Sequence, residues 1–123
     1  MKIPFWNATI TLYQRRETAN GAVDWVRSVH SGCFWQRKTL RSRNDGAEFA
    51  NTASLCRIPE PWPVVNIGDI IVCGNVQDVI DEYVAGQRSA DLLKKYAGSS
   101  MLVGDVHIND RRLPGVNHLY AGG

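Results

Sequence analysis

Strict alternation of apolar with polar side chains near the N-terminus is the feature that most constrains the fold of this chain. Apolar side chains occupy every second position from Trp6 to Leu12, with Asn or Thr between them. This period of two is typical of a half-buried β-strand. A second such run, residues 22–31, follows Asn20-Gly21, a dipeptide that favours the positive φ angles of a tight turn. The first thirty residues are therefore predicted to form a β-hairpin.

Further short apolar runs extend the β pattern along the chain. The clearest is Ile70–Cys73, a continuous apolar run between Gly68 and Gly74 that is too short for a typical helix. Other runs with strand-like composition are separated by polar or proline-rich stretches, and Pro59, Pro61 and Pro63 favour an extended connector. The additional predicted strands or extended segments are residues 32–40, 51–59, 101–108 and 116–123.

Two segments depart from the strand pattern. Residues 89–96 are predicted to form a short helix, with Ser89 as N-cap, Asp91 in the first turn and Gly98 as the stop. Residues 76–86 fit either a helical face or a strand with polar interruptions. Many short strands with little helix indicate a mainly β fold, a small β-barrel or sandwich with a long loop and one or two short helices.

The length of the chain favours a single domain. Its 123 residues lie within the usual size of one compact unit, and a 44% share of hydrophobic residues can supply a core. Residues 40–49 lack any periodicity and are predicted to be a long loop. Residues 109–123 begin with a turn-rich link and are predicted to be a C-terminal extension, within which 116–123 is a candidate closing strand.

The three cysteines do not form a recognisable framework. Cys33, Cys56 and Cys73 are odd in number, widely spaced and never in a CxxC pair, which argues against a disulfide scaffold or a zinc site. They are expected to be buried small hydrophobic residues in a reducing cytoplasm. No window approaches the roughly 18 to 20 apolar residues of a membrane span, so no membrane association is predicted.

The most uneven stretch of the sequence is a basic cluster that follows two aromatic residues. The formal net charge of the chain is only +2, so any nucleic-acid function has to rest on local clustering of this kind. A solvated loop is the default interpretation, and a loop presented to a partner or to DNA is the functional one. Trp35, just before the cluster, can stack on a base or belong to the core. The four basic residues are Arg37, Lys38, Arg41 and Arg43.

Little in the sequence indicates catalysis. No nucleophile, zinc or phosphate-loop motif is present. Asp105 and His107 form one candidate acid–base pair, but alternation on a strand places both on one surface. If their segment is helical, Asp78 and either Asp81 or Glu82 would share one face and could offer oxygens to a hard cation, although a solvated face is the default interpretation. The prediction is therefore no enzyme, no catalytic residue, no metal and no cofactor.

The order of these elements resembles the small neck proteins of tailed bacteriophages, the head–tail connector, head-completion or stopper-type family. The resemblance runs from about Trp6 to Tyr120 through "ITLYQRRETANGAVDWVRSVHSGCFWQ", a polar loop, "LCRIP", "IGDIIVCGNV" and "DLLKKY". It implies a small β-barrel subunit of the virion neck, assembled in the host cytoplasm into a homo-oligomeric ring beneath the portal. The implied partners are a portal or adaptor ring and tail proteins, together with non-specific contact to packaged DNA.

In this family, long loops project toward the channel or toward neighbouring rings and help retain packaged DNA. The resemblance thus implies that Arg37, Lys38, Arg41 and Arg43 belong to a DNA-channel or partner-interface element. The helical character of residues 76–96 and the extension beyond Asn109 depart from a plain barrel. The alternative prediction is a small β-barrel module that binds single-stranded nucleic acid through the same segment and Trp35.

Overall fold

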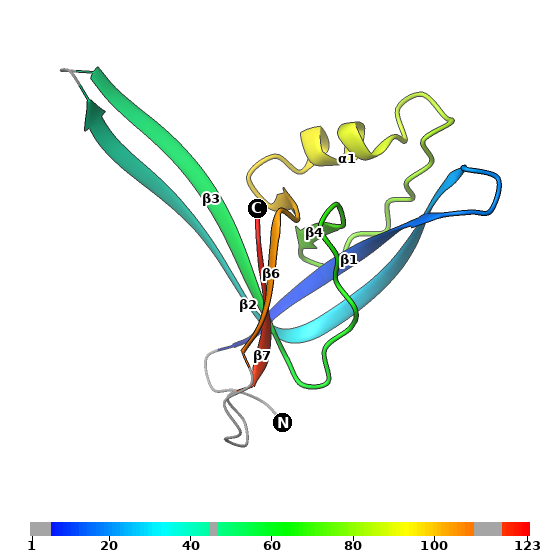
Figure 1. The fold of residues 1–123 in the computed structure, drawn as a ribbon, viewed down its shortest axis with the longest axis horizontal. Coiled ribbons are helices and arrows are strands. Elements are labelled where there is room, and N and C mark those ends of the chain that lie inside the picture. Colours follow the sequence, from blue (N-terminus) through cyan, green and yellow to red (C-terminus); the bar gives the residue numbers. More distant parts are fainter. Residues whose placement is uncertain (1–5, 45–46, 110–116) are drawn as a thin grey trace.

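The described residues of the chain form one antiparallel sheet of seven strands and a single short helix (Figure 1). The computed structural model describes residues 6–44, 47–109 and 117–123. The sheet order is β5-β4-β1-β2-β3-β7-β6, so the predicted mainly β fold is confirmed. The elements are β1 (Ala8–Glu17), β2 (Val23–Asn44), β3 (Ala47–Pro59), β4 (Ile70–Cys73), α1 (Ser89–Lys95), β5 (Ser100–Leu102), β6 (Asp105–Asn109) and β7 (His118–Gly122).

The sheet is curled but is not closed into the barrel that was one of the expected architectures. Its two edge strands, β5 and β6, follow each other in the chain and are separated only by Val103 and Gly104. The backbone N–H of Gly104 donates to the carbonyl of Gly122 at 2.8 Å, while that of Val103 donates to Asp69 at 2.8 Å. The two ends of the sheet thus approach each other through this link, and the twist of the strands wraps the sheet around its core.

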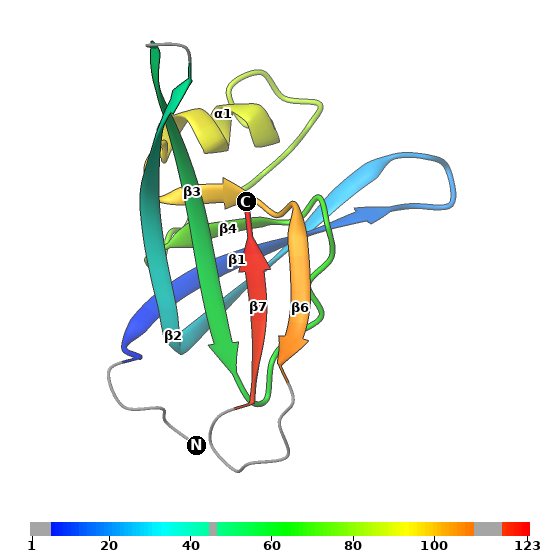
Figure 2. The same cartoon turned by 60° about the vertical axis from the view of Figure 1, so that its left-hand side comes forward.

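The predicted N-terminal hairpin is present, and its second strand continues into another hairpin. Residues 23–33 of β2 pair with β1, and residues 34–44 pair with β3. Gly21, in the first turn, has a φ of 78°, as the Asn-Gly signal predicted. The distal part of the β2–β3 hairpin extends away from the other strands (Figures 1 and 2).

The prediction of a long loop at residues 40–49 is wrong. Leu40 is paired with Asn51 and Arg43 with Glu48, so the strands run almost to the tip, where residues 45–46 lie outside the described part. A two-stranded ribbon is held by backbone hydrogen bonds and does not require the apolar alternation that a core-facing strand shows. The largely polar stretch 40–49 therefore lacks the apolar–polar alternation by which a strand is recognised in a sequence.

The candidate closing strand within residues 116–123 is confirmed, so these last residues belong to the sheet and are not an extension from it. His118–Gly122 forms β7, an internal strand between β3 and β6 that pairs Cys56 with Ala121 and Val106 with Ala121. Residues 110–116 lie outside the described part. The pairing of β3 with β7 joins segments about sixty residues apart, and such non-local pairing leaves no mark in the local pattern.

The core consists of two packed groups of side chains, one on each side of β1 and β4. Alternation on these strands sends Ile10 and Leu12 to one group and Tyr13 to the other, because successive strand residues point to opposite faces. The first group is Ile10, Leu12, Cys33, Cys56, Ile58, Val65, Ile71, Met101, Val103, Leu119 and Ala121. The second group is Tyr13, Ile70, Val72, Ile80 and Leu92.

The cysteines largely follow the sequence-based prediction. Cys33 and Cys56 are buried free thiols, and Cys73 is a partly buried one. Contact with Cys33 and burial together raise the pKa of Cys56 far above its usual range, so this thiol stays protonated. Both buried thiols act as small hydrophobic residues of the first core group.

The predicted helix is confirmed with a shift of one residue at its start. Ser89 is the first helical residue, and Arg88 is the N-cap, whose backbone N–H donates to Asp91 Oδ2 at 3.2 Å. No helix of the described residues is long and apolar enough to span a membrane.

Residues 76–86 form neither of the two structures considered for them. Side chains of the sheet bind their backbone carbonyls: Arg27 Nε donates to Val76 at 2.7 Å, and Tyr13 Oη donates to Asp78 at 2.6 Å. These hydrogen bonds provide donors for two backbone carbonyls of the segment, which can therefore follow an irregular path without the hydrogen bonds of a helix or a sheet.

A buried carboxylate fixes the turn that precedes β4. Asp69 is only 2% exposed, and its two carboxylate oxygens accept hydrogen bonds from different parts of the chain. Oδ1 accepts from the backbone N–H of Arg15 at 2.9 Å, and Oδ2 accepts from that of Asn66 at 2.8 Å. Asp69 therefore ties the connector after Pro63 to β1 at the edge of the core.

Candidate functional site

The four basic residues of the predicted functional loop all lie on β2, in the hairpin that it forms with β3. Arg37 pairs with Ser54, Arg41 with Ala50 and Arg43 with Glu48, so the residues are spread along the strand. Arg37 is exposed at the base of this hairpin, with its Nη1 3.4 Å from where a side chain at Gly98 would begin. The side chains of residues 38–52, including Lys38, Arg41 and Arg43, lie outside the described part.

The outer half of this hairpin is a two-stranded ribbon without a flanking strand among the described residues. The pairing of β1 with β2 ends at Cys33, and that of β7 with β3 starts at Leu55. Gly123 exchanges two backbone hydrogen bonds with Ser54, at 2.9 and 3.0 Å, and so marks the base of the ribbon. We use "ribbon" below for Arg37–Asn44 and Ala47–Ser54. A two-stranded hairpin alone is marginally stable in water and presents unpaired backbone groups on both edges.

Trp35 belongs to the core and not to an exposed stacking surface. It is partly buried, packs against the first core group and pairs in register with Cys56. Its neighbour Phe34 points to the other face of the sheet, because adjacent strand residues alternate. The sequence presented both aromatics side by side, and only the register separates their roles.

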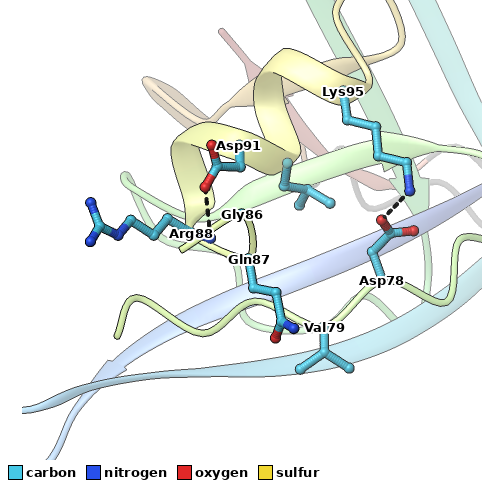
Figure 3. Close-up of a pocket in the computed structure, with 8 residues that line it drawn as sticks. Asp78, Val79, Gly86, Gln87, Arg88, Asp91 and Lys95 are labelled. Atoms are coloured by element: carbon cyan, nitrogen blue, oxygen red, sulfur yellow. Dashed lines mark hydrogen bonds and ion pairs between the residues drawn. The ribbon is translucent and has the colours of Figure 1, made fainter. Parts of the chain in front are cut away.

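A groove of about 450 Å³ lies between α1 and the irregular segment before it (Figure 3). Lys95 reaches across from the helix to Asp78, where Nζ donates to Oδ2 at 2.7 Å (Figure 3). Tyr96 Oη donates to the other oxygen of Asp78 at 2.6 Å. These two donors hold the pKa of Asp78 below its usual range. The groove is lined by Asp78, Val79, Gly86, Gln87, Arg88, Asp91, Leu92 and Lys95.

Replacing Asp78 with Asn is expected to lower the free energy of unfolding by at most about 1 kcal/mol at neutral pH, because an ion pair at the surface, here with Lys95 61% and Asp78 24% exposed, contributes little. A carboxyl whose pKa is lower in the folded protein stabilises it above the unfolded pKa, and that contribution is lost as the pH falls through the folded pKa. Urea unfolding of both proteins should therefore give stabilities that converge below about pH 4. A difference that persists in acid would contradict the ion-pair origin.

The two carboxylates that follow Asp78 bind separate backbone groups. Asp81 Oδ1 accepts from the backbone N–H of Tyr83 at 2.9 Å, and Glu82 Oε1 accepts from that of Ser89 at 2.9 Å. The bond from Ser89 lowers the pKa of Glu82. The shared helical face considered for a cation does not form, because the segment is not helical. Among the described residues, no group of three His, Cys, Asp or Glu side chains is placed to hold a metal ion.

The candidate acid–base pair on β6 is formed but is open to solvent. His107 Nε2 lies 3.0 Å from Asp105 Oδ2, and more than half of each side chain is exposed. The two residues share one side of an edge strand, as their spacing predicted. The His107 ring also lies 5.9 Å from the ring of Tyr120 on the neighbouring strand.

Comparison with known protein families places nearly all of this architecture in one family. A family model described as "Family of unknown function (DUF6751)" matches residues 5–123, so the chain belongs to that family. Comparisons with curated proteins and with solved structures found no match. The family description specifies no activity, and the function is therefore argued from the geometry of the described residues.

Proposed function

We propose that this member of a family of unknown function is a structural protein of the neck of a tailed-phage virion, acting by assembly and not by catalysis. In this role it forms a homo-oligomeric ring beneath the portal, in contact with a portal or adaptor ring and with tail proteins. The observation that carries the proposal is the ribbon, which projects from the sheet and, beyond the bonds of Ser54 to Gly123, has no flanking strand in the part of the chain that the structure describes (Figures 1 and 2).

The ribbon has the properties of an assembly element. Its unpaired N–H and C=O groups can add strands from a neighbouring subunit, and such pairing would stabilise a hairpin that is marginal alone. Arg37, Lys38, Arg41 and Arg43 lie along one of its strands, so a ring would repeat this charge around its axis. A nearly neutral subunit can thereby generate a positive collar that attracts DNA phosphates or an acidic partner surface.

The alternative of a barrel that binds single-stranded nucleic acid through this segment and Trp35 is less well supported. The sheet is not closed into a barrel, and Trp35 packs against the core. The basic strand could still contact phosphates, but the aromatic partner assigned to it is not available for stacking on a base.

A charge-removal variant tests the proposal in the particle. Changing Arg37, Lys38, Arg41 and Arg43 together to Ser is expected to leave the fold intact, since Arg37 is exposed and the backbone pairing of β2 with β3 does not depend on these side chains. Head–tail joining or DNA retention should fall about tenfold or more, because four contacts of about 0.5 kcal/mol each sum to about 2 kcal/mol. Joined, DNA-filled particles would be counted by electron microscopy.

A matched control removes the same amount of charge elsewhere. Arg15, Arg16, Arg88 and Lys94 lie outside the ribbon, and changing these four to Ser should leave joining unaffected. Quantitative mass spectrometry of purified wild-type particles should find the chain at a copy number that matches one ring. Absence of the chain from finished particles, or equal loss of joining in both variants, would overturn the proposal.

A further inference from the structure

Four side chains form a continuous row across the outer face of β2, β3, β7 and β6. Phe34 pairs in register with Arg57, Arg57 with Tyr120, and Tyr120 with His107. Directly opposed residues of an antiparallel pair point to the same face of the sheet. We call these four residues the aromatic row.

The aromatic row lies on the side of the sheet opposite to the first core group. The residues that alternate with it belong to the first core group, namely Cys33, Cys56, Ile58, Leu119 and Ala121. Phe34, Arg57 and Tyr120 are partly exposed, and His107 is exposed. A solvated sheet face is normally polar, so a run of aromatic and cationic side chains on it indicates a contact surface.

Aromatic rings and the Arg57 guanidinium pack together along the row. Arg57 Cζ lies 5.4 Å from the centre of the Phe34 ring, and Trp6 packs against Phe34 with ring centres 6.0 Å apart. The ring of Tyr120 lies over Gly122, where an added Cβ would meet Tyr120 Oη at 3.1 Å. A glycine at position 122 therefore lets the partly exposed Tyr120 lie along β7.

Arg57 adds a positive charge in the middle of this surface. Its guanidinium is held by the Phe34 ring, and within the described residues its buried Nε has no hydrogen-bond partner. Because Nε is shielded from solvent, an anionic group would meet Arg57 at the partly exposed remainder of its side chain, where the positive charge favours it. The ligand that suits the row therefore combines a flat aromatic plane with a negative charge.

We infer that the aromatic row binds single-stranded nucleic acid, with bases on Phe34 and Tyr120 and a phosphate at Arg57. Unpaired bases offer the π faces that aromatic side chains stack on, whereas the base faces of a duplex are hidden. Phe34 and Tyr120 are two strands apart, about 10 Å at the usual spacing, which suits separated bases with a phosphate between them. This site does not use Trp35, and the inference does not rest on the proposed role in the neck.

Binding is measured with the purified full-length chain and two fluorescein-labelled strands of equal charge. One is an oligothymidylate of about 15 nucleotides, long enough for a typical single-strand site, and the other is an abasic strand of the same length. The wild type should bind the oligothymidylate more tightly. Phe34→Thr and Tyr120→Thr should each weaken that binding roughly 5- to 150-fold, the value of one lost stacking contact, and leave abasic binding unchanged.

Arg57→Gln provides a second readout that does not depend on stacking. It should reduce the slope of log Kd against log salt concentration by about 0.7, the value for one phosphate on a single strand. Tyr83→Thr and Arg16→Gln change an aromatic and a basic residue that lie away from the row, and both should behave as wild type. Circular dichroism verifies the fold of every variant.

Three outcomes of the binding measurements would overturn the inference, and a fourth comes from sedimentation. The three are equal affinity of the wild type for the two strands, no binding of either strand, and an unchanged salt slope in Arg57→Gln. Sedimentation velocity addresses a second copy as the occupant: self-association of the wild type that is lost in Tyr120→Thr would assign the row to a subunit interface and reject nucleic acid. If a threonine variant fails to fold, the strand comparison and the Arg57→Gln slope still decide.

Discussion

Replacing Asp69 with Ala is expected to destabilise the protein by about 3 to 5 kcal/mol. The carboxylate is 2% exposed and accepts from the backbone N–H groups of Arg15 and Asn66. Hydrogen bonds to a charged group contribute about 1.5 to 3 kcal/mol each, and the variant leaves two donors at a buried site without an acceptor. Urea unfolding followed by tryptophan fluorescence measures the loss.

Two further variants define what that loss means. Asp69→Asn keeps the size of the side chain and one carbonyl acceptor, so it should retain one of the two bonds and lose roughly half as much stability. Asp24→Ala removes an exposed carboxylate that accepts only from the adjacent Trp25 N–H and should cost less than about 1 kcal/mol. A loss below about 1 kcal/mol in Asp69→Ala would show that the carboxylate does not hold the turn.

Predictions from sequence succeeded where a segment meets the core on one face. The alternation from Trp6 to Leu12 predicted β1, and the apolar run Ile70–Cys73 predicted β4 with its exact bounds. In both strands the apolar residues that form the recognisable sequence pattern are the same residues that pack into the core. The short helix was found through its acidic first turn and basic last turn, which are equally local features.

Predictions failed where the structure depends on pairing or on bonds to distant side chains. The strands of the ribbon are held by each other, and neither packs into a core group in the described part, so residues 40–49 lacked a period. The place of β7 in the sheet depends on β3, far away in the sequence. The path of residues 76–86 depends on Tyr13 and Arg27, which no pattern within that segment contains.

The candidate sites show the same division. The sequence located the basic cluster on the chain but not on a strand, because charge content says nothing about backbone pairing. Trp35 and Phe34 could not be told apart until the register placed one on the core side and the other on the outer face. The aromatic row was missed because its members come from four strands, and the pairing that aligns Arg57 with Tyr120 is non-local.

Replacing Leu12 with Ala is expected to lower the free energy of unfolding by about 3 to 4 kcal/mol. Leu12 is fully buried on β1, where Ser28 of β2 and Ile71 of β4 flank it in register. The substitution removes buried methyl groups from a site held by strands on both sides, so the cavity cannot easily collapse. Thermal unfolding should show a midpoint about 10 to 15 °C lower.

The comparison of Leu12→Ala with Ile10→Val separates cavity formation from general sensitivity of β1. Ile10 is as buried as Leu12, but its change to Val removes one methylene group and should cost only about 1 kcal/mol. Both variants should retain base-dependent oligonucleotide binding below their unfolding midpoints, since the aromatic row lies on β2, β3, β7 and β6. Equal losses of stability would mean that β1 is sensitive to any change in its buried side chains and that the size of the cavity does not set the loss. Cys33 and Leu119 belong to the same core group as Leu12 and alternate with row residues along their strands. Loss of binding in the folded Leu12→Ala variant would therefore mean that the aromatic row depends on the packing of this core group.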